Sequence, residues 1–262
     1  FQNYEIIKNF FLIDEIKNFL FPYEGQPFQN LLISEIKKKN KNIKSIGYIH
    51  YTHPFQLEII NRKGSPDRIY TYSPDQLKFF KKLNWRKKRI SLIPALSHKR
   101  NEDQKNKLKS KIFFPYKLSN EIIVLDILED FIKNNKNYSL PFFRIAPHPS
   151  PYNLKKQQKL EKDIQKLMKD YKKKFSSSVK ENFSIVIGLT TSIFVAIENG
   201  IRVIHISLDP IRDQLSTKLW PNVRVKSINN NLNIYSLKKK NSCILINNKF
   251  NNFEKFILDK II

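Results

Sequence analysis

Apolar and polar positions form their clearest pattern between Phe183 and Ser207, in the stretch FSIVIGLTTSIFVAIENGIRVIHIS. Two short β-branched runs, Ser184–Ile187 and Val203–Ile206, flank the apolar segment Ile193–Ile197, and a glycine stands between each run and that segment. This order predicts a buried strand, a helix and a second buried strand, which together make one βαβ unit of a parallel sheet.

Three hydroxyl residues, Thr190, Thr191 and Ser192, occupy the turn before the predicted helix. Free backbone N–H groups at a helix start attract phosphate, and ligands of open α/β sheets bind at the carboxyl ends of the strands. The same residue types also cap ordinary helices. The turn therefore indicates a phosphate site or a plain cap, and a second motif upstream, Pro147-His148-Pro149, favours the phosphate site.

The rest of the chain alternates strands with helices. In the first part, we expect one or two amphipathic helices over residues 1–20, helices over Phe28–Lys39 and from Ser73 to about Leu83, and strands at Lys44–Tyr51, Arg68–Tyr72 and Arg89–Ile93. In the second part, we expect strands at Lys111–Pro115 or Glu121–Leu125, and at Pro141–Ala146, Asn222–Ile228 and Cys243–Ile246, with helices over Lys155–Phe175 and Phe253–Ile262. The alternation predicts an α/β fold with parallel sheets.

The segment Ser97–Lys111 is charged and almost devoid of apolar residues, which is typical of a linker between lobes. We therefore expect a Rossmann-like N-terminal lobe over residues 1–96, a linker over 97–111 and a Rossmann-like nucleotide-binding lobe over 112–262, with a cleft between the lobes. The chain does not begin with Met, and its first candidate motif is at residue 23. The N-terminal lobe is thus expected to be incomplete.

Composition places the chain in the globular class, because 40% of its 262 residues are hydrophobic and 13% are aromatic. Its apolar runs are shorter than the roughly 20 residues of a membrane span, and acids interrupt the opening segment, which argues against a signal peptide. The single cysteine, Cys243, excludes an intrachain disulfide and a cysteine-based zinc site, and it favours a cytoplasmic location.

The net charge of +25 raises nucleic acid as a partner. However, lysine far outnumbers arginine, and Asn and Ile are abundant too, which is typical of an A- and T-rich genome. No RRM, KH, helix-turn-helix or zinc-finger pattern is present, so no specific nucleic-acid partner is expected. Solvated lysines explain the charge most simply, and contact with an anionic membrane surface stays open as a second explanation.

Two further residues are candidates for chemistry. His148 follows a predicted strand between two prolines, so a fixed imidazole could donate to a phosphate, although a loop histidine bonded to nearby backbone is the ordinary alternative. Glu24 precedes Gly25 in a loop bounded by Pro22 and Pro27. Its carboxylate could accept a proton near neutral pH, although glutamates in loops are mostly exposed and without such a role.

In their order and spacing, Tyr23-Glu24-Gly25, His148-Pro149 and Thr191-Ser192 resemble the acidic–Gly, HP and Ser/Thr–Ser motifs of bacterial sialyltransferases and related Kdo transferases with a GT-B fold. The stretches YEGQPFQN, KSIGYIHY and TTSIFVAIENGIRVI are also similar to bacterial surface carbohydrate biosynthesis proteins, which make capsule or lipopolysaccharide. The resemblance covers scattered parts of residues 22–75 and 141–225.

The resemblance implies an inverting glycosyltransferase that moves a sialic acid- or Kdo-like sugar from a CMP-activated donor to a surface glycan or glycolipid acceptor. Glu24 would be the general base, and His148 would hydrogen-bond the donor phosphate. That phosphate would also be held at Pro149 and by the hydroxyls of residues 190–192. No metal and no further cofactor are implied, and the C-terminal lobe would bind the nucleotide sugar. His50 and His53 are candidates for acceptor contacts.

The sequence departs from UDP- and GDP-sugar enzymes of the GT-B class, many of which place a ribose-binding glutamate four residues before a Gly-x-Pro turn. Here Val195 and Ala196 occupy that part of the helix, Glu198 lies only two residues before Gly200, and Arg202 replaces the proline. A UDP- or GDP-sugar transferase or epimerase-like enzyme stays an alternative, as does a basic protein that binds nucleic acid or a membrane surface. The expected location is cytoplasmic, with peripheral contact at the inner face of the cytoplasmic membrane left open.

Overall fold

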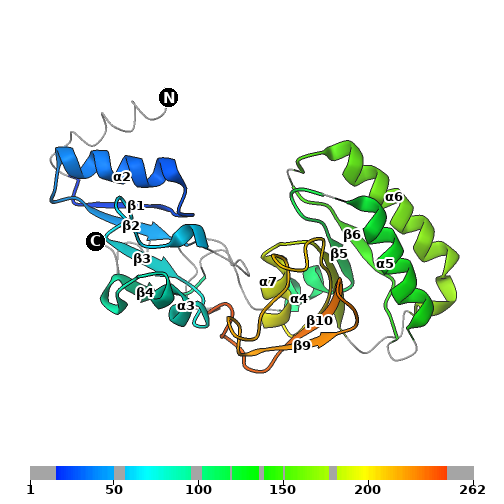
Figure 1. The fold of residues 1–262 in the computed structure, drawn as a ribbon. Coiled ribbons are helices and arrows are strands. Elements are labelled where there is room, and N and C mark those ends of the chain that lie inside the picture. The colour runs from blue at the N-terminus through cyan, green and yellow to red at the C-terminus, as the bar shows by residue number, and fades with distance from the viewer. Residues whose placement is uncertain are drawn as a thin grey trace. The chain divides into compact units, whose positions relative to one another are not determined.

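The computed structural model describes residues 16–49, 57–95, 102–118, 120–135, 139–149, 151–176 and 182–246 (Figure 1). The chain divides into two compact units. Unit 1 comprises Phe1–Tyr51, Gln56–Lys99 and Asn241–Ile262, and unit 2 comprises Thr52–Phe55 and Arg100–Lys240. No helix in the described part of the chain is long and apolar enough to cross a lipid bilayer.

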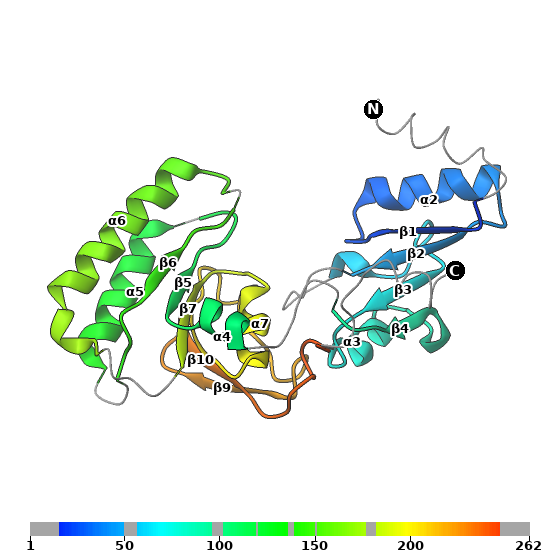
Figure 2. The same cartoon turned by 180° about the vertical axis from the view of Figure 1, so that it is seen from behind.

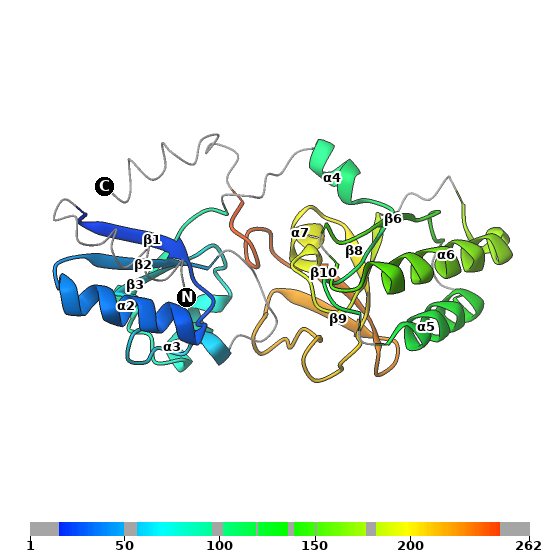
Figure 3. The same ribbon diagram turned by 90° about the horizontal axis from the view of Figure 1, so that it is seen from above.

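Unit 1 is built on a four-stranded parallel sheet in the order β1-β2-β3-β4. Its elements are β1 (Asn18–Pro22), α2 (Pro27–Lys39), β2 (Lys44–Tyr48), η1 (Leu57–Ile59), β3 (Arg68–Thr71), α3 (Gln76–Lys82), η2 (Lys87–Arg89) and β4 (Ile90–Leu92). Because neighbouring parallel strands are joined by right-handed crossovers, α2 and α3 cover the same face of the sheet (Figure 3). Tyr23, Ile69, Phe80 and Trp85 form the centre of a core on that face.

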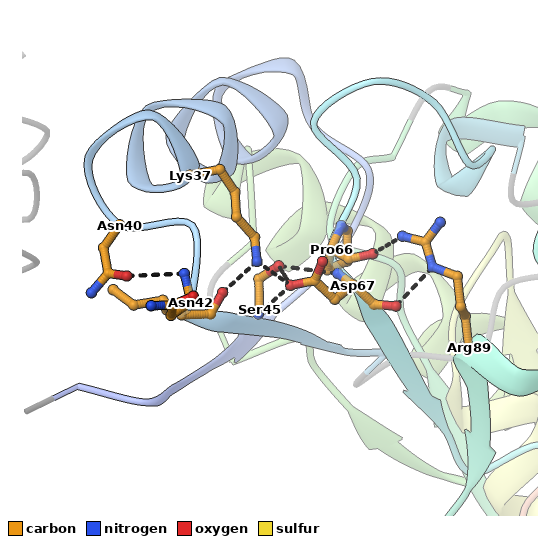
Figure 4. A network of polar contacts seen from close by, with 8 residues as sticks. Lys37, Asn40, Asn42, Ser45, Pro66, Asp67 and Arg89 are labelled. Atoms are coloured by element: carbon orange, nitrogen blue, oxygen red, sulfur yellow. Dashed lines mark hydrogen bonds and ion pairs between the residues drawn. The ribbon is translucent and has the colours of Figure 1, made fainter.

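A polar network joins the amino ends of β2 and β3 to their neighbours (Figure 4). The Asp67 carboxylate accepts hydrogen bonds from the backbone N–H and the hydroxyl of Ser45, at 2.8 and 2.9 Å, and pairs with Lys37 Nζ at 2.6 Å. Arg89 donates to the carbonyls of Pro66 and Asp67. Burial alone would raise the pKa of Asp67, but the hydrogen bonds from Lys37 and Ser45 outweigh it and lower this pKa below its ordinary 3.8.

Unit 2 is built on a six-stranded mixed sheet in the order β6-β5-β7-β8-β10-β9. Its elements are α4 (Glu102–Leu108), β5 (Lys111–Phe113), α5 (Glu121–Asn134), β6 (Arg144–Ala146), α6 (Leu154–Asp170), η3 (Lys172–Lys174), β7 (Phe183–Ile187), α7 (Ser192–Glu198), β8 (Arg202–Ile206), β9 (Val223–Ser227) and β10 (Leu232–Leu237). The strands β6, β5, β7 and β8 are parallel, while β10 is antiparallel to β8 and β9.

Helices cover both faces of this second sheet. The pair α5 and α6 lies side by side on one face, whereas α4 and α7 lie on the other (Figures 1 and 2). Alternate residues of β7 follow this division, since Ile185 and Ile187 join the core under α5 and α6. Ser184 points to the other side and donates to the carbonyl of Leu108 in α4. The predicted α/β class, with parallel strands and covering helices, is therefore confirmed, and the sheets are compatible with a Rossmann-like fold.

Several predicted elements differ from the structure. Residues 18–20, predicted as helix, belong to the strand β1, in which Phe19 and Phe21 stack on one another at 4.8 Å. Residues 1–15 lie outside the described part. Glu121–Leu125 starts a helix, so the alternative at Lys111–Pro115 was the right choice for the strand. The sequence interpretation also missed β10, which pairs with the predicted strand at 222–228.

The boundary between the units differs from the predicted division in two places. Residues 102–108 of the predicted linker form the helix α4, which contacts β7. The described residues 241–246 belong to unit 1 instead of following β10 in unit 2. Leu245 donates its N–H to Tyr72 at 2.7 Å and accepts the N–H of Ala95 at 2.8 Å, but this segment is not a strand as predicted. The predicted helix at Phe253–Ile262 lies outside the described residues.

Candidate functional site

Two of the predicted motifs lie at the same edge of the unit 2 sheet. His148 comes two residues after the end of β6, and Thr190 comes three residues after the end of β7. Both strands run parallel to β5, which lies between them, so their carboxyl ends point the same way. Adjacent strands are about 4.8 Å apart, so β6 and β7 are separated by roughly 10 Å. One phosphate-bearing ligand at this edge could therefore reach both loops.

The turn after β7 has a backbone that requires glycine. Gly188 has a φ of +62°, in the left-handed region, and a Cβ there would lie 3.2 Å from Leu208 Cδ1. Its N–H donates to the carbonyl of Ile206 at 2.7 Å, which continues the ladder between β7 and β8. The chain thus leaves the sheet sharply and presents its next residues at the edge.

The three hydroxyl residues of this turn have different local roles. The Ser192 N–H donates to Thr190 Oγ1 at 3.3 Å, and the hydroxyls of these two residues are 3.2 Å apart. The Thr190 side chain therefore stabilises the turn by accepting a hydrogen bond from the backbone two residues further on. Thr191 occupies the N-cap position with helical φ and ψ and makes no side-chain cap bond. All three residues are half-buried, and the helix that they open, α7, contains seven residues.

His205, a buried histidine that the sequence interpretation missed, contacts the turn after β7 from the neighbouring strand β8. His205 is fully buried in β8, and its Nε2 lies 3.0 Å from the carbonyl oxygen of Gly188. Because a carbonyl can only accept, Nε2 carries the proton, and Nδ1 accepts from the Tyr235 hydroxyl at 3.3 Å. That hydroxyl in turn accepts the N–H of Leu215 at 3.2 Å. The signal in the sequence was a titratable residue inside the β-branched run Val203–Ile206.

Burial sets the protonation of this pair. It lowers the pKa of His205 from 6.5 to about 4, although the hydrogen bond to Gly188 works in the opposite direction. Burial also raises the pKa of Tyr235 to about 12. Both side chains are consequently neutral at pH 7. The pair acts as a fixed, uncharged support that links the turn after β7 to the loop after β8.

The loop after β8 is organised by two carboxylates. Asp213 accepts the backbone N–H groups of Leu208 and Asp209, at 2.9 and 3.0 Å. Asp209 accepts those of Ile211 and Arg212, at 3.0 and 3.2 Å. These bonds satisfy a run of backbone donors that would otherwise face the carboxyl edge of the sheet. Hydrogen bonds within residues 208–213 therefore hold the loop after β8 in a fixed conformation.

His148 lies against an aromatic cluster that the sequence analysis did not single out. Its imidazole is half-buried and meets the Tyr116 ring edge-to-face, with centroids 5.6 Å apart. Tyr116 contacts Tyr152 in the same manner at 6.2 Å, and the Tyr152 N–H donates to the Tyr116 carbonyl at 2.8 Å. Both tyrosines follow a proline just beyond a strand, and this repeated Pro-Tyr pair was the available signal. The cluster limits the orientations of the imidazole.

Glu24 lies in unit 1, directly after β1, in a loop held by one amide. Gln29 Oε1 accepts the N–H of Glu24 at 2.9 Å and that of Gln26 at 3.1 Å, while Gln29 Nε2 donates to the Pro22 carbonyl at 2.9 Å. Gly25 has a φ of +76°, and a Cβ there would lie 2.0 Å from the carbonyl oxygen of Glu58. The half-buried carboxylate is therefore carried on a backbone with little freedom.

The residues under this loop form a second buried network. Tyr23 is fully buried, and its hydroxyl is 2.9 Å from the Asn30 side chain and 3.4 Å from Ser65 Oγ. Arg62 Nη2 donates to the Gly25 carbonyl at 2.7 Å. Burial raises the pKa of Tyr23, so its hydroxyl stays protonated. Through these contacts, Tyr23 anchors the loop that carries Glu24 to the core of unit 1.

The predicted site residues thus fall into three groups. His148, Pro149, Thr190, Thr191 and Ser192 share one edge of the unit 2 sheet, and Glu24 belongs to unit 1. His50 and His53 lie outside the described residues. In the described ranges, no three His, Cys, Asp or Glu side chains gather as a metal site. Compared with known proteins, the chain matches no protein-family model and no curated sequence.

Proposed function

We propose that the protein is an inverting glycosyltransferase that moves a sialic acid- or Kdo-like sugar from a CMP-activated donor to a surface glycan or glycolipid acceptor. The single observation that carries the proposal is the shared edge of the unit 2 sheet, where His148 and the hydroxyl turn at 190–192 follow parallel strands with β5 between them. The order of the motifs along the chain, with Glu24 ahead of both, is the order that the resemblance requires.

The proposed chemistry depends on charge at the leaving group. Negative charge grows on the CMP phosphate as its bond to the sugar breaks, so donors fixed around that phosphate act most strongly in the transition state. The imidazole of His148 and the hydroxyls of Thr191 and Ser192 would be these donors. Such a scheme uses protein groups alone and calls for no metal ion. The aromatic contacts of His148 hold the imidazole in place, and the buried hydrogen bond from His205 to the Gly188 carbonyl holds the turn that carries the hydroxyls.

In the same proposal, Glu24 removes the proton from the acceptor hydroxyl as the hydroxyl attacks the sugar. A general base needs a fixed position relative to the proton that it accepts. The bonds of Gln29 around Glu24 and the restricted backbone at Gly25 supply such a support within unit 1. The reaction would take place in the cytoplasm, where activated nucleotide sugars are consumed, with the acceptor as the second substrate.

The burial of Glu198 favours a CMP donor over the UDP- or GDP-sugar alternative. This glutamate is fully buried in α7, so its carboxylate is not presented at the surface to grip a ribose. The alternative also lacks a glutamate at Val195 or Ala196. A UDP- or GDP-sugar enzyme would therefore need a ribose contact from another element.

The first experiment is a nucleotide panel read by thermal unfolding of the full chain. CMP should raise the unfolding midpoint, because a ligand that binds the folded state stabilises it in proportion to its concentration over Kd, while UDP and GDP should have little effect. The double variant His148→Ala, Ser192→Ala should lose the CMP shift. Ser236→Ala is the matched control, since Ser236 lies near the end of β10, at the opposite edge of the same sheet.

A second variant tests the base separately. Glu24→Gln should keep CMP binding and lose turnover, measured as CMP release from a CMP-sugar in the presence of acceptor. Unchanged CMP binding by the His148, Ser192 double variant would remove the phosphate site. Unchanged turnover by Glu24→Gln would remove the base, and a shift with UDP or GDP but not CMP would favour the alternative donor.

A further inference from the structure

The outward face of α6 carries a regular row of lysines. Lys155, Lys159, Lys162, Lys166 and Lys169 follow one another at spacings of four and three residues, which keeps them on one side of an α-helix. The buried residues of α6 are Gln157, Leu160, Ile164 and Met168. At 100° per residue, this buried side is centred opposite the lysines. The row therefore points directly away from the core of unit 2.

The five lysines of the row are exposed cations, and one of them, Lys159, lies close enough to Glu121 of α5 to help lower the pKa of that carboxyl. None of the five takes part in an ion pair among the residues that the structure describes. The neighbouring Lys156, which faces α5, does pair with Glu121 at 3.4 Å. Asp163 follows Lys159 by four residues and Asp170 follows Lys166 by four, so these two acids border one side of the row. Lys155 and Lys169 are 14 residue steps apart, so the row is about 21 Å long.

Exposed apolar side chains flank this row. Tyr152 and Leu154 directly precede it and are 67% and 55% exposed. On the side away from α5, Phe142 and Arg144, at the sheet edge formed by β6, line a surface depression together with Lys169. A cluster of four to eight basic residues on one side of a helix attracts an anionic membrane surface, and exposed apolar side chains beside it can enter the interface. A solvated lysine face would not need the apolar groups.

We propose that this lysine row, with the apolar residues beside it, docks unit 2 on an anionic membrane surface. The partner is chosen by charge complementarity: a straight row of ammonium groups fits a plane of phosphate headgroups, while Tyr152 and Leu154 enter the region between headgroups and acyl chains. Nucleic acid fits less well, because the row contains only lysines and so lacks the arginine forks that read base edges. The proposal does not rest on the glycosyltransferase activity.

The test is partition of the full chain onto sedimented vesicles of phosphatidylcholine, with and without phosphatidylglycerol, at about 0.1 M salt. A lysine near an anionic surface contributes about fivefold in binding, or about 1 kcal/mol. Changing all five row lysines to Gln should therefore lower binding to the anionic vesicles at least roughly a hundredfold. The control changes five exposed lysines of α3 and η2 to Gln, namely Lys78, Lys81, Lys82, Lys87 and Lys88. It removes the same charge and should lower binding less than about tenfold.

The orientation of unit 2 on the membrane is tested with a Tyr152→Trp variant, because the two natural tryptophans, Trp85 and Trp220, are buried. The fluorescence emission of the new tryptophan should shift to the blue when anionic vesicles are added, because its side chain leaves water. Changing the five row lysines to Arg should restore binding, and thermal unfolding checks that each variant is folded. The proposal would be overturned if the row and control variants lost vesicle binding equally, or if the wild type bound neutral and anionic vesicles equally well. It would also be overturned if the row variant kept vesicle binding and instead lost RNA binding or self-association.

Discussion

Acidification should weaken unit 2 through His205. Its pKa lies near 6.5 in an unfolded chain and near 4 in the folded protein, where burial disfavours the imidazolium. Between these values the unfolded chain binds more protons than the folded one, so stability must fall as the pH is lowered. The full contribution is present above about pH 6.5 and is lost by about pH 4. At about 1.4 kcal/mol per pH unit, this difference of about 2.5 units in pKa corresponds to about 3.5 kcal/mol.

The matched variant is His205→Gln, whose side chain does not titrate. Its free energy of unfolding should be lower than that of the wild type at pH 7 by about 1–3 kcal/mol, because the hydrogen bond from Tyr235 to Nδ1 is lost. The difference in free energy of unfolding between the wild type and His205→Gln should shrink by about 2 kcal/mol between pH 7 and pH 5. Acid destabilises only the wild type at this position, because its imidazole binds a proton more readily in the unfolded chain than in the folded protein.

Urea unfolding can follow unit 2 alone. The chain has two tryptophans, Trp85 in unit 1 and Trp220 in unit 2, so a Trp85→Phe background leaves Trp220 as the reporter. Trp220 is buried against Phe194, with ring centroids 4.4 Å apart, and its emission should change on unfolding. If the stabilities of wild type and His205→Gln fell in parallel with pH, His205 would not be a buried neutral residue, and its proposed support of the Gly188 turn would lose its basis.

Three further outcomes are expected. Gly25→Ala should destabilise unit 1 by more than about 2 kcal/mol in urea, because the new Cβ would meet the Glu58 carbonyl, whereas Gly200→Ala, with a φ of +77° and no atom within 4 Å, should cost unit 2 about 1 kcal/mol. Asp67→Asn should cost unit 1 up to about 1 kcal/mol at pH 7; the lowered pKa of Asp67 means that this difference should fade as the pH drops below 3.8. Tyr116→Ala should weaken CMP binding in calorimetry at unchanged stability, and a Tyr116→Phe variant that keeps its ring contact should bind as the wild type does.

Local patterns were sufficient to predict the central part of the fold. The βαβ unit from β7 to β8 follows directly from two β-branched runs around a helical segment, and the strand before His148 was expected where β6 lies. The strands β7 and β8 are buried on both faces of the sheet, so their sequences leave few alternatives. The edge strand β1 is different: its aromatic residues suit a helix and a strand equally well, and pairing with β2 decides between them.

Long-range pairing explains most of what the sequence did not reveal. The strand β10 is recognisable only as the antiparallel partner of β8 and β9, and the return of residues 241–246 to unit 1 depends on bonds of Leu245 with Tyr72 and Ala95. His205 was missed for a similar reason. Its neighbours along the chain suggest an ordinary strand residue, whereas its partners, Gly188 and Tyr235, come from two other strands or their turns.

The division of the candidate residues between the units separates the two halves of the proposed reaction. The contacts described for His148 and for the turn at 190–192 come from residues of unit 2. Glu24 is anchored within unit 1 by Gln29. In the proposed reaction, donor binding and proton removal would therefore be supported by different sets of described contacts. It follows that a variant in one set of contacts should change one step of the reaction, and that changes in CMP affinity on substitution of Glu24 would contradict this separation.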